Sequence, residues 1–335
     1  MTVTRRNLIT AATALPMVAL ISRRGQAAEF EYKLATGQDP THPVNKRAQE
    51  AINRIREATN GRVAFNLFPA NQLGSDTDLL AQVRSGGVEM FNLSTSILAT
   101  FVPVAGIVNT GFAFASYDKV WAAMDGALGT HIREQTAKAG LVAPGKLWDN
   151  GFRQITSSTR QIKTPDDLKG FKIRVPPAPM LTSVFKTLGA GATPINFNEL
   201  YSALQTQVVE GQENPLAIFA SAKLFEVQKY VSMTGHVWDG YMMLANRRAW
   251  AALPADAQAI ITRELDRSAA DERADIAVLS QSLRDDLVKK NITFFDVDRD
   301  LFRAALAKTS FYADWKKTYG EEAWGLMEAT TGKLG

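Results

Sequence analysis

Two hydrophobic periods alternate along this chain, and their alternation limits the folds that it can adopt. Apolar residues occupy every second position over 30–34 and 63–67, which is the spacing of half-buried strands. Between these runs, apolar residues over 48–58 recur at helical spacing. A helix expected over 76–85 and a strand over 88–93 continue the rhythm. The pattern predicts an α/β fold with largely parallel sheets.

A second series of the same kind follows later in the chain. It has expected strands near 152–156, 171–175 and 193–196, with helices between them. The stretch 255–290 then contains neither Gly nor Pro, which favours one long helix of ~50 Å at 1.5 Å per residue. A short strand over 292–295 and two or three helices complete the chain. We therefore expect two α/β domains, hinged as a clamshell and braced together by the long helix.

The first 27 residues have the order of an export signal. Arg5 and Arg6 precede an apolar run from 11 to 21, and small residues at 25–27 resemble a cleavage site. An apolar run of this length is too short to cross ~30 Å of hydrocarbon as a helix. The paired arginines predict a signal peptide of the twin-arginine type, a periplasmic location and no stable membrane insertion.

Charge and composition exclude several classes of function. The chain has 38 Lys and Arg against 34 Asp and Glu, and four of the arginines lie in residues 1–27. Without that segment the two signs balance at 34 each, so we expect no nucleic-acid partner. There is no cysteine, and the three histidines lack metal-ligand spacing. No nucleophile or phosphate-binding motif is present, so we predict no enzyme activity, catalytic residue, metal or cofactor.

Two arginines are candidates for binding an anion. Arg174 lies in Lys172–Pro177, near the carboxyl end of an expected strand that two prolines stop and a helix follows. Ligands bind at this edge of open α/β sheets, and a helix start supplies N–H donors. Arg153 lies beside Gly151–Phe152 in a similar setting. Taken alone, ordinary surface contacts are the more common role for either arginine.

Several motifs in order resemble one family. They are Gly170–Pro176 (GFKIRVP), Glu199–Thr206 (ELYSALQT), Val209–Leu216 (VEGQENPL), Asn71–Gly74 (NQLG), Asn150–Arg153 (NGFR) and Glu226–Tyr230 (EVQKY). The chain resembles the DctP-type solute-binding proteins of TRAP (tripartite ATP-independent periplasmic) transporters over essentially its whole length after the signal. The resemblance implies a protein that captures a small organic acid between two domains and delivers it to TRAP membrane subunits.

The resemblance also implies roles for individual residues. Arg174, in the KIRVP motif, takes the position of the main ligand-carboxylate anchor, and Arg153 that of a second contact to the same acid. Further implied contacts come from Asn214, Phe197, Ser94, Thr95, Gln38 and Asp76. Sialic-acid-binding members carry an acidic residue where Ser94 aligns, which argues against that ligand here.

Two assignments stay open between pocket and core. Trp148, with nearby aromatics, suits either a pocket for an aromatic acid or the hydrophobic core. His42 suits either the cleft or a capping and loop-packing position.

The expected boundaries are a signal peptide at 1–27, domain I at 28–149 plus 239–278, and domain II at 150–238 plus 279–335. Three alternatives to a TRAP binding protein stay open: a binding protein of an ATP-driven importer, a sensor, or a periplasmic enzyme acting on organic acids. The ligand stays open among C4-dicarboxylates, sugar acids, 2-oxo acids and aromatic acids.

Overall fold

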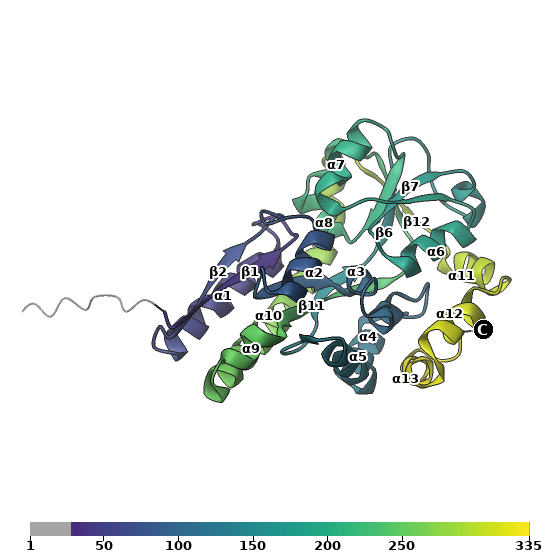
Figure 1. The fold of residues 1–335 in the computed structure, drawn as a ribbon. Helices are drawn as coiled ribbons and strands as arrows, with labels where there is room; N and C mark the ends of the chain where they lie inside the picture. Colours follow the sequence, from purple (N-terminus) through teal and green to yellow (C-terminus); the bar gives the residue numbers. More distant parts are fainter. Residues whose placement is uncertain (1–27, 335) are drawn as a thin grey trace, which may run out of the picture.

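The computed structural model describes residues 28–334, which contain two separate six-stranded sheets (Figure 1). The first sheet has the order β2-β1-β3-β11-β4, with β5 also paired to β11. Its strands are β1 (Phe30–Thr36), β2 (Val63–Phe68), β3 (Met90–Ser94), β4 (Leu141–Val142), β5 (Trp148–Phe152) and β11 (Trp238–Asn246). The second sheet has the order β12-β10-β6-β9-β7-β8. Its strands are β6 (Gln154–Ser157), β7 (Lys172–Val175), β8 (Gly191–Pro194), β9 (Gly211–Asn214), β10 (Tyr230–Met233) and β12 (Thr293–Asp296).

Helices cover and connect these sheets, as the α/β prediction required. The α-helices are α1 (Pro43–Ala58), α2 (Asp76–Ser85), α3 (Thr95–Leu98), α4 (Tyr117–Met124), α5 (Ala127–Lys138), α6 (Pro179–Thr187), α7 (Phe197–Gln205), α8 (Leu216–Ser221), α9 (Arg247–Ala252), α10 (Ala255–Val288), α11 (Arg299–Ala307), α12 (Phe311–Tyr319) and α13 (Glu321–Thr331). The 3-10 helices are η1 (Pro103–Asn109), η2 (Pro165–Leu168) and η3 (Leu224–Glu226).

Local chemistry accounts for the boundaries near the first sheet. Helix α2 begins at a capping box, in which the Ser75 side chain and the Asp78 side chain each bond the other's backbone N–H. Helix α1 has Pro43 in its first turn, where the missing N–H costs nothing. After α1 the backbone turns through left-handed conformations at Asn60 and Gly61 into β2. Strand β2 then pairs in parallel with β1, which completes the first βαβ unit.

The expectation of largely parallel sheets is wrong for part of each sheet. Strand β11 runs antiparallel to β3, β4 and β5, and β6 runs antiparallel to β9 and β10. The remaining pairs, such as β1 with β3 and β7 with β8, are parallel. The antiparallel strands lie where the chain passes between sheets, so they are not joined to their neighbours by a βαβ crossover.

The chain crosses between the sheets in three places. The single strand expected near 152–156 is two strands, and Arg153 alone separates β5 in the first sheet from β6 in the second. A second crossing runs from β10 to β11 through residues 234–237. The third is α10, a 34-residue helix that contacts α1 and β5 at one end and α8 and β12 at the other (Figure 1). The predicted bracing helix is therefore confirmed.

The chain ends in three helices that return toward the first sheet. Helix α11 contacts η2, α12 contacts α6 and η1, and α13 packs against α4, α5 and η1. The part of the chain that the structure describes contains no helix long and apolar enough to cross a membrane. The export signal predicted at 1–27 lies outside the described residues.

Candidate functional site

A polar pocket lies between the two sheets, where the chain crosses from one to the other. It takes its walls from both sheets. The lining residues are Gln38, Asp76, Ser94, Ser96, Ile97, Asn150, Arg153, Arg174, Pro176, Phe197, Asn214, Ile218 and Tyr241. Seven of these were predicted for the site: Gln38, Asp76, Ser94, Arg153, Arg174, Phe197 and Asn214. The fold therefore brings together residues that are far apart in sequence.

Arg174 reaches this pocket from the end of β7. The strand stops at Val175 because Pro176 and Pro177 follow, and α6 begins at Pro179. Its side chain is 1% exposed, and Nε donates to the carbonyl of Ile195 at 2.9 Å. Within residues 28–334, no ion pair and no other hydrogen bond engages its guanidinium. Burial therefore lowers the pKa of Arg174 to about 10, although Glu213 opposes the shift from a distance.

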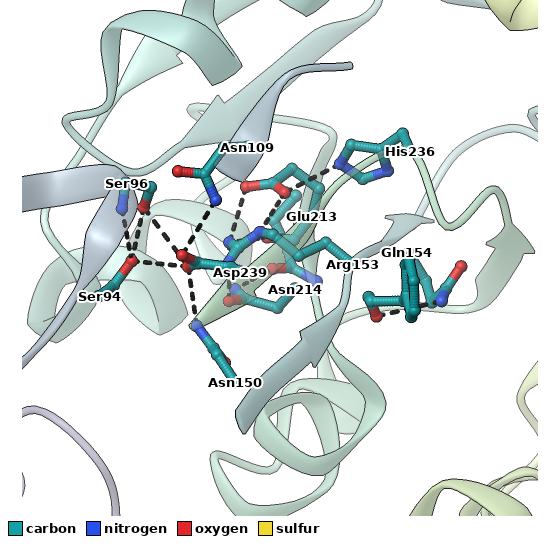
Figure 2. Close-up of polar contacts among 12 residues, drawn as sticks. Ser94, Ser96, Asn109, Asn150, Arg153, Gln154, Glu213, Asn214, His236 and Asp239 are labelled. Carbon is teal, nitrogen blue, oxygen red and sulfur yellow. Dashed lines mark hydrogen bonds and ion pairs between the residues drawn. The ribbon is translucent and has the colours of Figure 1, made fainter. Parts of the chain in front are cut away.

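Arg153 is as deeply buried as Arg174 but is fully engaged by protein groups. Its Nε and Nη2 form a two-pronged ion pair with Glu213 at 2.5 and 2.8 Å, and Nη2 also donates to Asn214 Oδ1 at 2.9 Å (Figure 2). Its Nη1 lies 3.3 Å from Asp239 Oδ2. Burial alone would lower the pKa of Arg153, but the attraction of Glu213 outweighs it and the pKa is raised.

Glu213 is held on its other side by His236. The Nε2 atom of His236 lies 3.0 Å from Glu213 Oε2, and both residues are almost completely buried. Burial lowers the pKa of His236, so the neutral ring is favoured. Burial alone would raise the pKa of Glu213. The positive charge of Arg153 and the hydrogen bonds from His236 and Arg153 act in the opposite direction and together outweigh burial, so the pKa of Glu213 lies below its usual range. Arg153 and Glu213 are thus a mutually neutralised pair in the pocket wall.

Asp239 ties this pair to the first sheet. It receives hydrogen bonds from Ser94 Oγ at 2.6 Å, Asn109 Nδ2 at 3.0 Å and Asn150 Nδ2 at 2.9 Å (Figure 2). Thr95 Oγ1 donates to it at 2.9 Å. Ser96 Oγ also donates to Oδ2 at 3.5 Å, so the carboxylate accepts from five side chains besides Arg153. Such a satisfied carboxylate costs little to bury, and it fixes the β3–α3 corner against both crossing strands.

The first sheet contributes Asp76 to the opposite wall. Asp76 is the first residue of α2, and its Oδ1 accepts from Asn71 Nδ2 at 2.9 Å. The side chain is buried without an ion pair among the described residues, and burial raises its pKa while Asn71 and Arg174 oppose the rise. Asp76 is therefore a buried acceptor in the same pocket as Arg174.

Three predicted residues lie outside the lining. Thr95 is fully buried and bonds Asp239. Trp148 is fully buried in the core of the first sheet, which corresponds to the core alternative. His42 is the N-cap of α1, where its Nδ1 accepts a hydrogen bond from the backbone N–H of Val44 at 3.3 Å. Burial lowers the pKa of His42 to about 4, so the ring is neutral and can accept.

Five lining residues were not predicted for the site, namely Ser96, Ile97, Asn150, Pro176 and Ile218, and a sixth, Tyr241, is one of the aromatics considered for the pocket together with Trp148. Asn150 and Pro176 lie in the NGFR and KIRVP motifs that identified their neighbours, so those motifs held a usable signal. Residues 28–334 contain no cluster of three or more His, Asp or Glu side chains arranged to hold a metal ion. The pocket offers donors and acceptors for a polar organic molecule.

Comparisons with known proteins agree with this geometry. A family model for bacterial extracellular solute-binding proteins, family 7 (DctP), matches residues 34–317. A solute-binding protein of Roseobacter denitrificans is 33% identical over 295 residues, covering 86% of this chain and 88% of that protein. An uncharacterised protein of Sinorhizobium fredii is 34% identical over 314 residues, and the match covers 91% of this chain but only 57% of that longer protein.

A solved structure shares the whole architecture. The crystal structure of a TRAP periplasmic solute-binding protein from Polaromonas sp. JS666, bound to D-erythronate, matches with a TM-score of 0.87 at 28% identity. The match covers 91% of this chain and all of the Polaromonas chain. The two-sheet arrangement is therefore that of a two-domain clamshell.

Proposed function

This chain belongs to the family 7 bacterial extracellular solute-binding proteins, and on that premise we propose how its pocket selects and holds a ligand. Its TRAP relatives are periplasmic proteins that bind small organic acids and work with TRAP membrane subunits. The proposed ligand is accordingly a small carboxylate, held between the lobes in the pocket that Arg174 and Asp76 line.

The unpaired guanidinium of Arg174 carries the assignment. A planar fork of N–H donors matches a carboxylate with two parallel, charge-assisted hydrogen bonds. The protein buries this fork in a cleft but leaves its terminal nitrogens without an acceptor in residues 28–334, so an anionic ligand would complete it. Arg153 lines the same pocket, yet Glu213 already occupies two of its nitrogens. We therefore assign Arg174 as the anchor and Arg153 as a supporting contact through Nη1.

The other assigned ligand contacts divide between the lobes. Asn214 has one N–H committed to Gln212 and its oxygen to Arg153, which leaves one N–H for the ligand. Phe197 supplies an apolar surface at the start of α7. From the first sheet come Gln38, Asp76 and Ser94, and the buried Thr95, Trp148 and His42 support this wall from behind its lining.

Closure of the clamshell links binding to transport in this proposal. We propose lobes of 28–149 plus 239–278 and 150–238 plus 279–335, although β5 extends the first sheet as far as Phe152. Helix α13 packs back onto α4 and α5 of the first lobe. A ligand that touches Arg174 in one lobe and Asp76 in the other stabilises the closed form only when bound. The membrane subunits would distinguish the loaded shape from the empty one. Export by the twin-arginine route and release of the acid chemically unchanged are part of the same proposal.

Calorimetry of Arg174 variants tests the assignment. Arg174→Ala should weaken binding of the best carboxylate by several hundred-fold or more, because removing one partner of a buried charge pair costs ~3–5 kcal/mol. Arg174→Lys should recover only part of the affinity, since an ammonium lacks the fork. Arg263→Ala, which removes an exposed arginine that pairs with Glu264, is the matched control and should bind like wild type. Wild-type affinity in Arg174→Ala would refute the anchor role.

A further inference from the structure

Within residues 28–334, the pocket lining has one cation and one carboxylate that form no ion pair, Arg174 and Asp76. No ion pair holds Arg174 among residues 28–334, and Asp76 is buried with only a neutral hydrogen bond from Asn71. The other charged groups of the pocket and its wall are Arg153, Glu213 and Asp239, which engage one another. The pocket therefore has two charged groups left to bind a ligand, the guanidinium of Arg174 and the carboxylate of Asp76.

The count of charges limits what can enter. Two guanidiniums, Arg153 and Arg174, face three carboxylates, Asp76, Glu213 and Asp239, and His236 is neutral. One ligand carboxylate finds a partner in Arg174. A second carboxylate would meet no free cation in the described lining and would approach Asp76, which repels it. In a dewatered cleft such a like-charge contact discriminates strongly.

The same residue attracts a hydrogen-bond donor. An ionised carboxylate only accepts hydrogen bonds, so the group that satisfies Asp76 is a hydroxyl or an ammonium. Gln38 lines the same pocket, and its Oε1 is buried without a hydrogen-bond partner within residues 28–334. It is a further acceptor for a ligand donor.

We propose that this protein selects monocarboxylates whose far end carries a hydroxyl or ammonium donor, and that Asp76 excludes dicarboxylates. This inference rests on the proposed function of the pocket, because Arg174 must hold the first carboxylate. It assigns Asp76 as the specificity-determining residue. The open list of organic acids thereby narrows to hydroxy acids and zwitterionic amino acids.

Ligands of equal length that differ only at one end test the proposal. The probes are 4-hydroxybutanoate, 4-aminobutanoate and succinate, together with D-erythronate and meso-tartrate, which differ only in a terminal hydroxymethyl against a carboxylate. Calorimetry of the mature protein should give a donor-terminated member that binds at least tenfold more tightly than its dicarboxylate counterpart. The Asp76→Asn variant, which removes the charge and keeps the shape, should reduce that ratio to below threefold.

A control variant separates a local from a general charge effect. Glu199→Gln removes one negative charge from an exposed position in the first turn of α7, outside the lining, and should leave the ratio unchanged. The selectivity is overturned if a dicarboxylate binds as tightly as its donor-terminated counterpart. If the affinity for that dicarboxylate also falls in Arg174→Ala, the proposed function still stands. Failure of all five probes to bind wild type, while another carboxylate without a donor at its far end binds through Arg174, also overturns the selectivity and leaves the proposed function standing.

Discussion

The contrast between Arg174 and Arg153 leads to an unusual prediction: removing one buried arginine should stabilise the unliganded protein. Methionine keeps much of the length and apolar volume of the arginine stem and carries no charge. In Arg174→Met the change removes a buried cation that no carboxylate pairs within residues 28–334. In Arg153→Met the same change removes the partner of Glu213, which would remain buried and uncompensated.

The magnitude follows from the pKa of Arg174. A solvated guanidinium has a pKa of ~12.5, and each tenfold change in acidity corresponds to ~1.4 kcal/mol. The pKa of about 10 that burial imposes on Arg174 therefore places the cost of its charge at ~3 kcal/mol. Removing this charge therefore stabilises the fold, but losing the hydrogen bond from Nε to Ile195 offsets ~1 kcal/mol of that stabilisation. We expect Arg174→Met to be more stable by ~2 kcal/mol and Arg153→Met to be less stable by ~3–5 kcal/mol.

Differential scanning calorimetry without ligand measures both effects. At ~2 cal/mol/K of unfolding entropy per residue, a gain of ~2 kcal/mol raises the Tm of a chain of this size by ~3 °C. If the lobes of the wild type open in solution, water hydrates Arg174 and its charge carries no burial cost. In that case Arg174→Met favours the closed form of the unliganded protein and does not raise the Tm. Small-angle scattering would then show a smaller radius of gyration for unliganded Arg174→Met than for the unliganded wild type.

Two results would refute the reasoning. One is a lower Tm for Arg174→Met than for wild type, comparable to the loss in Arg153→Met. The other is an unchanged Tm together with an unchanged radius of gyration. Either would mean that burying this guanidinium carries no free-energy cost, and the argument that it awaits an anionic ligand would lose its support.

Further predictions concern the core. Burial raises the pKa of Asp149 to about 7, although Trp238 Nε1 donates to it at 2.8 Å, so the folded state binds a proton that the unfolded chain releases near pH 4. The free energy of unfolding of the wild type should therefore fall as the pH rises from 4 to 7. Chemical denaturation of Asp149→Asn should show a smaller fall over the same range. An equal fall in the two proteins would exclude Asp149 as the cause. Gly211→Ala should lose ~3 kcal/mol, because its Cβ would lie 2.1 Å from the carbonyl oxygen of Thr156. Gly325→Ala, in helix α13 with open space at its Cβ, should gain ~0.5–1 kcal/mol in the same denaturation assay, and equal effects at both glycines would contradict this packing argument.

Some features of the fold could be predicted from sequence because short-range physics sets them. Helix α2 occupies 76–85 as expected, since its capping box and the glycine after its last turn are local signals. The long helix α10 follows equally from a stretch without Gly or Pro. The position of Arg174 at the end of β7 follows from the two prolines that stop the strand.

Other features depend on residues distant in sequence. The expected strand near 152–156 is continuous in its local pattern, and only pairing with β11 on one side and β9 on the other divides it at Arg153. The antiparallel strands arise in the same way, because strand direction is set by the partner and not by the strand's own residues. Trp148 and His42 have polar atoms and apolar bodies that suit a pocket or a core, and the packing around them places both outside the lining.

The chain's own order of residues therefore determined the α/β elements, the bracing helix and a basic residue at a strand end, because periodicity, capping and proline act within a few positions. The tertiary structure decided which of two similar arginines is paired. Glu213 lies 60 residues from Arg153 in sequence and reaches it only because β6 and β9 are neighbours. Since the free energy of a buried charge depends on the groups within a few ångströms, no local pattern could distinguish the neutralised Arg153 from the unpaired Arg174.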